Sequence, residues 1–569
     1  MKRFLLSFIL MVYMTSISTF SQIAPEKYVA WLSDKANNPY SLSNPSEFLS
    51  ERALERRARY NIPLDNKDLP VTPQYVERIA QIGVQVLHSS KWLNFVMFQT
   101  ADHSLVEQIQ QLEFVIKVEK MKRRIRTEPC PVNKVLYESY YPKPNEINFF
   151  SSQLNLKFSS LTANLDYGAA YTQIHMVKGD ELHRMGYLGD GMLIVLLDAG
   201  FNSADINPAF DSLWMKGRIL GYRDIVQRGN NVFSTSMSPH GAYVLSIMGA
   251  NLPGQMVGTA PHASYYLIRT EDDGSEYIIE EYNWVTGAEL ADSLGADIIN
   301  SSLGYTVFDD PSQNHTYADM DGNTAISSRG ADIAASKGIL VVNSAGNSGS
   351  SAWHYIGAPA DGDSVFTIGA VDRWGYYASF SSTGPTYDGR IKPNVMAMGQ
   401  GTAVVDIYGN VTYGSGTSFS SPLTAGCIAC LWQSKLGKNN MTVMQSVMQT
   451  ASQFNKPDSL MGYGIPDFLA AFQTLSVGQR ECANHNNFTV SPSFFIDNLI
   501  ITNELNRDEN FSLSLLDVQG KLILEKEFQG GNRYFYLRDE IRNLKPGLYI
   551  LQISYSSGFD SFKLIKLKQ

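Results

Sequence analysis

Short apolar runs that alternate with helical patterns constrain the fold of this 569-residue chain most strongly. Between about residues 165 and 475, five such runs lack the polar alternation of a half-exposed strand. They cover residues 192–197, 265–268, 297–301, 339–343 and 365–371. Continuous apolar strands separated by helices are typical of a parallel sheet that helices cover on both faces. The sequence therefore predicts an α/β domain over residues 165–475, with its chemistry at the carboxyl ends of the strands.

The charge balance argues against two other classes of protein. The formal net charge is -9, and 44% of the residues are hydrophobic while 18% are charged. A disordered chain has too few apolar residues to build a core, which is not the case here. A nucleic-acid-binding domain is usually basic, with Lys and Arg clustered on one face. We therefore expect a folded protein of several domains with no nucleic-acid partner.

The first 21 residues have the pattern of a signal peptide. A basic start, Met1-Lys2-Arg3, precedes a mostly apolar run over residues 4–14, and Thr19 and Ser21 are small residues at a plausible cleavage point. That run is too short to span a membrane comfortably, and no later run reaches 18 apolar residues. The sequence predicts export, with no transmembrane segment in the mature chain.

Residues 22–122 have the pattern of a small α+β domain. Strand-like runs at 28–32 and 84–99 flank a helix-compatible stretch at 45–60, and a second helix is expected at 105–112. The basic run Lys120–Arg126 opens a polar linker, 123–164. That run is compatible with a processing site and equally with a solvated strand edge.

The chain changes character after a second linker, residues 476–489. Residues 490–569 alternate polar and apolar positions and contain turns at Gly520, Gly530-Gly531 and Pro546-Gly547. Short alternating strands with regular turns are typical of a small β-sandwich. This segment concentrates no His, Cys or paired acids, so we expect no catalysis there.

Four polar side chains follow predicted strands or precede helices in the α/β domain. Asp198 ends the run at 192–197, His240 and Ser418 each open an apolar helix, and Asn347 follows the run at 339–343. A hydroxyl nucleophile, an imidazole base and a carboxylate that orients the imidazole are the groups that acyl transfer requires. A side-chain amide can donate to the oxyanion. Each group alone is weak support, but together they indicate a hydrolase.

The surrounding segments LLDAGF, PHGAYV, NSAGNS and SGTSFSSP resemble the subtilisin-type serine proteases (peptidase S8 family). The resemblance implies that Asp198 orients the imidazole, His240 acts as base and acid, Ser418 attacks, and Asn347 binds the oxyanion. It also implies substrate-binding walls made by two segments. Their residues are Ser301, Ser302, Leu303, Gly304, Ser344, Ala345 and Gly346. Ala199 and Tyr243 depart from the family pattern, where a hydroxyl residue and often a second His stand.

The flanking domains carry looser resemblances. The N-terminal domain is similar to the propeptides of such proteases, and the C-terminal segment resembles the type IX secretion sorting domains of Bacteroidetes, on Leu544–Leu551 and Lys563–Lys566. Together they imply a secreted serine endopeptidase, made as a zymogen, that hydrolyses proteins or peptides. They imply export by the type IX machinery through the periplasm to the medium or outer surface. The alternative is a catalytically weak surface binding protein on a protease scaffold.

Three further features allow two interpretations each. The acidic stretch 271–281 has two interpretations: its negative charges attract basic side chains of a substrate, or they form the solvated start of a helix. Asp319, Asp321 and Asn323 have part of the spacing of a calcium loop, or form a simple turn. Cys427 and Cys430 form a CxxC without a second ligand pair, so we expect core residues in preference to a metal or redox site. We expect no required cofactor and no catalytic metal, with calcium as the one candidate structural ion.

Overall fold

The computed structural model describes residues 26–121, 165–476 and, with short gaps, 488–566. The expected signal peptide (1–21), the linker 123–164, the basic run beyond Met121 and nearly all of the linker 476–489 lie outside these residues. The chain divides into two compact units, residues 1–476 and 477–569. Within the described ranges, no helix is both long enough and apolar enough to cross a membrane.

Seven strands form the central sheet of the first unit in the order β13-β12-β11-β10-β5-β9-β6. Every neighbouring pair is parallel. The strands are β5 (Leu193–Asp198), β6 (Ile219–Asp224), β9 (Ser264–Arg269), β10 (Ile298–Ser301), β11 (Leu340–Ser344), β12 (Phe366–Val371) and β13 (Val395–Met398). This sheet confirms the predicted α/β class.

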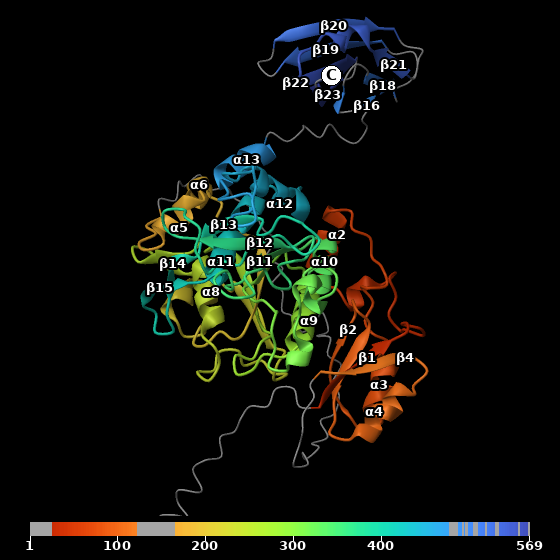
Figure 1. Ribbon diagram of the computed structural model, residues 1–569, viewed down its shortest axis with the longest axis vertical. Helices are drawn as coiled ribbons and strands as arrows, with labels where there is room; N and C mark the ends of the chain where they lie inside the picture. The colour runs from red at the N-terminus through yellow and green to blue at the C-terminus, as the bar shows by residue number, and fades with distance from the viewer. Residues whose placement is uncertain are drawn as a thin grey trace, which may run out of the picture. The chain divides into compact units, whose positions relative to one another are not determined.

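Helices cover both faces of the sheet, and β5 shows how. Ile194 and Leu196 face α8 (His240–Gly249) and α11 (Thr417–Gln433) in one apolar cluster. Their neighbours Leu193, Val195 and Leu197 face the opposite side. There they meet α9 (Ile279–Leu294) and α10 (Ile326–Ser336), which lie side by side (Figure 1). Both faces of β5 are buried, which explains its unbroken apolar sequence.

The strand order places a topological switch at β5. The chain leaves β5 toward β6 and β9 on one side and then continues with β10 on the other side. Ligand sites in open parallel sheets lie outside the carboxyl ends of the strands at such a switch. The remaining elements of this domain are α5 (Tyr171–Met176), α6 (Gly179–Arg184), α7 (Asp211–Met215), β7 (Asn251–Leu252), β8 (Met256–Val257), β14 (Gln400–Val405), β15 (Val411–Ser415), α12 (Asn440–Gln449) and α13 (Phe468–Ser476).

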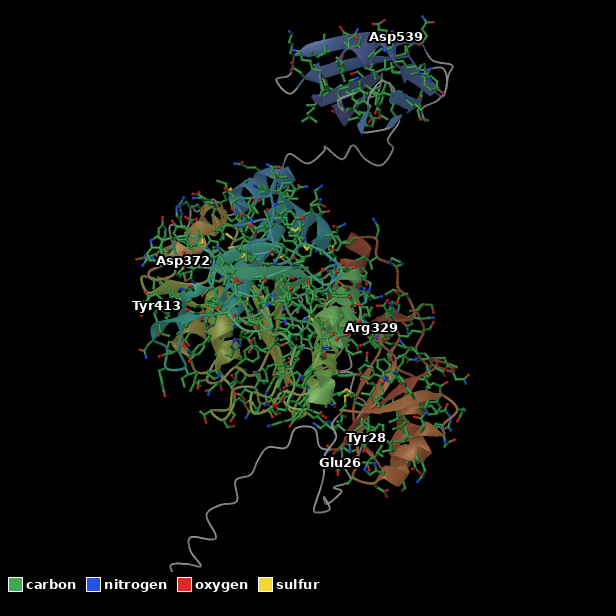
Figure 2. The ribbon with its side chains drawn as sticks, in the orientation of Figure 1. Glu26, Tyr28, Arg329, Asp372, Tyr413 and Asp539 are labelled. Atoms are coloured by element: carbon green, nitrogen blue, oxygen red, sulfur yellow. The ribbon has the colours of Figure 1, made fainter. Side chains whose placement is uncertain are left out.

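The β14–β15 hairpin leads directly into α11, the helix that carries Ser418. Tyr413 of β15 points outward at the edge of this domain (Figure 2), and 66% of its surface is exposed. The hairpin thus lies at the surface, and the chain runs from it to the carboxyl edge of the sheet.

The N-terminal domain is an antiparallel sheet of order β2-β3-β1-β4, as the α+β prediction requires. Its elements are β1 (Lys27–Leu32), α2 (Glu51–Arg59), α3 (Pro73–Gln81), β2 (Gln85–Ser90), β3 (Phe95–Gln99), α4 (His103–Gln110) and β4 (Val115–Lys120). Residues of α3 and α4 pack on one face of the sheet. On the other face, Phe95 and Met97 pack against Tyr282 of α9.

The helix-compatible stretch 45–60 forms a helix over only part of its length. A short 3-10 turn, Pro45–Glu47, ends before α2 begins. Ser50 separates the two, and its hydroxyl accepts a hydrogen bond from the Ala53 N–H at 3.2 Å. Serine side chains accept hydrogen bonds from the free N–H groups at a helix start. Ser50 therefore caps the start of α2.

The second unit has two sheets of orders β16-β18-β21 and β17-β23-β22-β19-β20. Its elements are β16 (Phe488–Ser491), β17 (Phe494–Phe495), β18 (Leu499–Asn503), β19 (Phe511–Asp517), β20 (Leu522–Phe528), β21 (Tyr534–Leu537), α14 (Asp539–Arg542), β22 (Gly547–Tyr555) and β23 (Gly558–Lys566). Alternate residues of β18, β19 and β22 are buried in one core. This arrangement confirms the predicted β-sandwich.

Candidate active site

Asp198 is the last residue of β5 and is fully buried at the carboxyl edge of the sheet. Its Oδ1 accepts from Nδ1 of His240 at 2.8 Å and from the backbone N–H of Ala199 at 2.8 Å. In the described part of the chain, its Oδ2 has no hydrogen-bond partner. Ala199 therefore supports the carboxylate through its backbone, without the side-chain hydroxyl that the family pattern has at this position.

His240 is the first residue of α8, and 32% of its side chain is exposed. Its enclosed surroundings oppose the charged ring, but the carboxylate of Asp198 outweighs them and raises the pKa of His240 above its ordinary value. Because Nδ1 binds Asp198, Nε2 is the nitrogen left to exchange a proton with another group. The imidazole is thus held in one orientation.

Ser418 is the second residue of α11 and is 9% exposed. In the described residues its hydroxyl donates to the carbonyl of Ser302 at 3.4 Å, and no hydrogen bond joins it to His240. The next residue, Phe419, stacks on the His240 ring at a centroid distance of 6.3 Å. Ser418 and His240 therefore lie at the starts of two helices that contact each other.

Asn347 follows β11 and is held by Thr417, the residue before Ser418. Its Oδ1 accepts from the Thr417 N–H at 2.8 Å and from the Thr417 hydroxyl at 3.0 Å. Since Oδ1 is engaged, Nδ2 is the end of the amide that can donate to a ligand. The N–H of Ser418 lies in the first turn of α11, where backbone donors lack an acceptor within the helix.

A cavity of about 150 Å³ adjoins Ser418 and Asn347. Five of the predicted substrate-binding residues line it: Ser302, Leu303, Gly304, Ser344 and Gly346. The sequence did not point to the rest of its lining, which consists of Thr306, Ser348, Tyr355, Gly357, Ser382 and Thr417. No charged side chain belongs to this lining among the described residues.

Two predicted substrate-binding residues do not line the cavity. Ser301 is fully buried, and its hydroxyl accepts from the indole N–H of Trp284 at 2.9 Å. Ala345 is fully buried in a small apolar cluster with Ile356 and Ala360. Alternate residues along an extended segment point to opposite sides. Ser301 and Ala345 therefore support the walls from behind.

The acidic stretch 271–281 is largely buried, so a solvated helix start is the wrong description of it. Glu271 accepts from the hydroxyl of Tyr305 at 2.7 Å, beside the cavity wall. Glu280 accepts from the N–H of Asp272 at 2.9 Å. Burial raises the pKa of both glutamates well above their ordinary range. A preference for basic substrate side chains along this edge stays a prediction.

In the candidate calcium loop, the Asp carboxylates accept hydrogen bonds from nearby residues of the same segment. Oδ2 of Asp319 accepts from the N–H and hydroxyl of Thr316 at 2.6 and 2.8 Å. Asp321 accepts from the N–H groups of Asn323 and Thr324 at 2.8 and 2.7 Å. No group of three or more His, Cys, Asp or Glu side chains in the described residues could hold a metal. The local bonds agree with a turn, and calcium binding stays a prediction without support from this geometry.

Cys427 and Cys430 lie inside α11 in the main core, as expected. Burial raises the pKa of both thiols above the ordinary value. Because the thiolate is the reactive form, buried thiols of high pKa are unreactive. These cysteines pack the helix that carries Ser418.

The parallel sheet with an acid, a base and a hydroxyl at its carboxyl edge is the architecture of an α/β hydrolytic enzyme. Residues 189–464 match the family model of the subtilase family. Residues 27–134 match the peptidase S8 propeptide domain of Bacteroidota, and residues 492–567 match a secretion system C-terminal sorting domain.

Characterised relatives agree with these matches. The chain is 30% identical over 306 residues to subtilisin E of Bacillus subtilis, covering 53% of this chain and 70% of the relative. It is 32% identical over 263 residues to subtilisin DY of Bacillus licheniformis, covering 45% of this chain and 82% of the relative. The protein belongs to the subtilisin family and is a subtilisin-like serine endopeptidase with an N-terminal propeptide domain. Its type IX sorting domain confirms the expected export to the cell surface or beyond.

Proposed function

We propose that the protein is a secreted zymogen whose mature form hydrolyses peptide bonds through Asp198, His240 and Ser418. The observation that carries the proposal is the 2.8 Å bond between His240 and the buried Asp198, next to a cavity bordered by Ser418 and Asn347. A carboxylate, an imidazole, a hydroxyl and an amide donor are the complete set of groups for acyl transfer.

The reaction begins with rotation of the Ser418 side chain from the Ser302 carbonyl toward Nε2 of His240. As the hydroxyl oxygen attacks the substrate carbonyl carbon, Nε2 takes its proton, and Asp198 stabilises the imidazolium. The Asn347 amide and the Ser418 N–H donate to the oxyanion. His240 then protonates the leaving amine, and water hydrolyses the acyl-enzyme by the same steps in reverse order.

The alternative, a catalytically weak surface binding protein, is less well supported. Ala199 removes one side-chain donor from Asp198, but the Ala199 backbone N–H still binds that carboxylate at 2.8 Å. Tyr243 lies one turn of α8 beyond His240, and neither residue 199 nor residue 243 transfers a proton or an acyl group. A binding protein has no need for the ordered Asp198–His240 pair.

A Ser418→Ala substitution tests the proposal. We expect turnover of a protein substrate by the processed enzyme to fall about 10⁶-fold, the cost of removing the nucleophile of a triad. Ser350→Ala is a matched control because its hydroxyl is exposed and donates to the Ser379 carbonyl at 2.8 Å. Equal turnover by the Ser418→Ala variant and the unchanged enzyme would remove Ser418 as nucleophile.

A further inference from the structure

Residues 302–306 form one wall of the cavity beside Ser418. Ser302 and Thr306 both line the cavity, and the Ser302 carbonyl accepts a hydrogen bond from the Ser418 hydroxyl. Thr306 lies against Gly357 of the opposite wall, because a Cβ atom on Gly357 would be 2.8 Å from Cγ2 of Thr306. The position of residues 302–306 therefore sets the width of the cavity between Ser418 and Gly357.

Tyr305 anchors this wall from behind. It does not line the cavity, and it is only 1% exposed. Its hydroxyl donates to Oε1 of the buried Glu271 at 2.7 Å. Its backbone N–H donates to the Ala358 carbonyl at 2.7 Å, and its carbonyl accepts from the Ala358 N–H at 3.2 Å. A phenol buried this deeply requires a polar partner, and Glu271 is that partner.

Glu281 provides a second fixed point, in the first turn of α9. Its side chain is fully buried. Its Oε2 accepts from the N–H and the hydroxyl of Ser327, in the first turn of α10, at 2.9 and 2.8 Å. N–H groups in the first turn of a helix have no acceptor within the helix, so Glu281 caps α10. Its Oε1 accepts from Nε2 of His315 at 2.6 Å.

His315 connects Glu281 to the cavity wall. The backbone N–H of His315 donates to the carbonyl of Thr306 at 2.9 Å. The His315 ring is 10% exposed and meets the buried Phe308 ring edge-on at a centroid distance of 5.6 Å. The chain therefore turns back after Thr306, and the Glu281–His315 bond fixes the end of that turn.

The charges near His315 strengthen this bond. Burial opposes the charged form of the ring, but the bond to Glu281 and the negative charges of Glu281, Asp319 and Asp361 outweigh it. They raise the pKa of His315 above its ordinary value. A hydrogen bond between charged partners is stronger than one between neutral groups. The pair is therefore suited to hold the wall in one position.

We propose that Glu271 with Tyr305 and Glu281 with His315 are two positioning pairs that hold residues 302–306 in place. They thereby set how strongly the enzyme binds the substrate side chain that enters the cavity. None of the four side chains lines the cavity, so they act through the wall and not on the substrate itself. The proposal rests on the proposed function only in that the cavity receives the substrate of a protease.

Hydrogen exchange tests the support without relying on activity. Exchange of residues 303–316 in the Ser418→Ala chain is followed by mass spectrometry. His315→Ala and Tyr305→Phe should each speed exchange at least about tenfold, because each removes a hydrogen bond to a buried carboxyl group. His315→Gln should stay closer to the parent, since the Gln amide can still donate to Glu281. Unchanged exchange in both His315→Ala and Tyr305→Phe would refute the proposal, whatever the activity of Ser418.

His262→Ala is the matched control. Nδ1 of His262 lies 3.1 Å from a carboxylate oxygen of Asp190, so this residue also forms a histidine–carboxylate pair. His262 is 37% exposed and precedes β9, which places it at the amino edge of the sheet, opposite the active site. Its removal should leave the exchange of residues 303–316 unchanged.

The kinetics of the processed enzyme test the consequence for substrate binding. Two peptides differ only in the residue before the scissile bond, which is Leu in one and Gly in the other. His315→Ala should raise KM about tenfold for the Leu peptide and change kcat less than about twofold, because it weakens binding in the ground state and transition state alike. KM for the Gly peptide should hardly change, since Gly leaves the cavity empty.

A small dialkyl fluorophosphate completes the test. It should label Ser418 in His315→Ala as fast as in the parent, because the triad is intact. Slower labelling, or an equal rise in KM for both peptides, would place the role of His315 outside the cavity and overturn the proposal. If the parent itself is neither labelled nor active, the proposed function fails, and hydrogen exchange alone decides whether the two pairs hold the wall.

Discussion

Nδ1 of His240 lies 2.8 Å from Oδ1 of Asp198, which is fully buried while the imidazole remains partly open to solvent. The bond fixes the tautomer of His240 and raises its pKa, so that the ring is a stronger base than a free histidine. A stronger base takes a proton from Ser418 more readily. At low pH the ring is already protonated and cannot accept that proton, so activity is lost.

The first prediction concerns the pH dependence of kcat/KM. Activity should fall as the pH drops through the pKa of His240, with a midpoint above about 6.5, the ordinary histidine value. Asp198→Asn removes the negative charge, so the midpoint should move to lower pH while kcat falls about 10⁴-fold. Initial rates on a neutral peptide substrate give both quantities. If the midpoint pH of kcat/KM is the same in Asp198→Asn and in the unchanged enzyme, Asp198 does not raise the pKa of the group that limits activity.

The second prediction concerns the oxyanion. Asn347→Ala should lower kcat about 10²–10³-fold with little change in KM, because the Asn347 amide donates only to charge that develops in the transition state. Thr417→Val removes the hydroxyl that binds Oδ1 of Asn347 at 3.0 Å and should cause a smaller loss. A rise in KM with constant kcat for Asn347→Ala would instead assign Asn347 to ground-state binding.

The third prediction concerns the residue before the scissile bond. The cavity beside Ser418 has hydroxyl and backbone groups in its walls and, in the described residues, no charged side chain. A charged side chain would lose water there without a partner, which is costly. Peptides with an uncharged residue at this position should exceed matched Lys and Glu peptides at least about tenfold in kcat/KM. Equal values across such a series would show that the cavity does not receive this side chain.

The fourth prediction concerns Lys392, whose amine is buried and donates to the carbonyl of Val365 and the hydroxyl of Thr367. Burial lowers its pKa from 10.5 to about 7. Between these values the folded chain binds fewer protons here than the unfolded chain, so stability should rise with pH. The free energy of unfolding of the Ser418→Ala chain, obtained from thermal unfolding, should rise between about pH 7 and 9. Lys392 should contribute up to about 2 kcal/mol of this rise.

Lys392→Met is the control for that experiment. The substitution removes the titrating amine, so the part of the pH dependence that belongs to it should disappear, even if the Val365 carbonyl loses its partner and overall stability falls. An unchanged slope between the two pH values would mean that Lys392 is not the group responsible.

Much of the fold could be predicted because its sequence signals are local. The apolar runs at 192–197, 297–301 and 339–343 became β5, β10 and β11 almost without shift, since a strand buried on both faces has no polar positions. The edge strand β6 was missed because its residues are only partly buried and show no apolar run. Helix α3 was missed as well, although Pro73 at its first position is a helix-start signal.

The candidate site was predictable only in part. Asp198, His240, Asn347 and Ser418 were found because each stands beside a strand end or helix start in a recognisable segment. Tyr355 and Ser382, which line the cavity, come from loops far away in sequence, and loops carry no periodicity. The burial of Glu271 and Glu280 was missed because charged residues are ordinarily solvated, and only the three-dimensional partners reveal otherwise.

The most direct test of the account is labelling with a fluorophosphonate, which reacts with activated serine hydroxyls. The processed protein is labelled, digested and analysed by mass spectrometry, beside Ser418→Ala and His240→Ala. We expect one labelled peptide, containing Ser418, and loss of labelling in both variants. A label on another serine, or full labelling of Ser418 in the His240→Ala protein, would contradict the proposed triad.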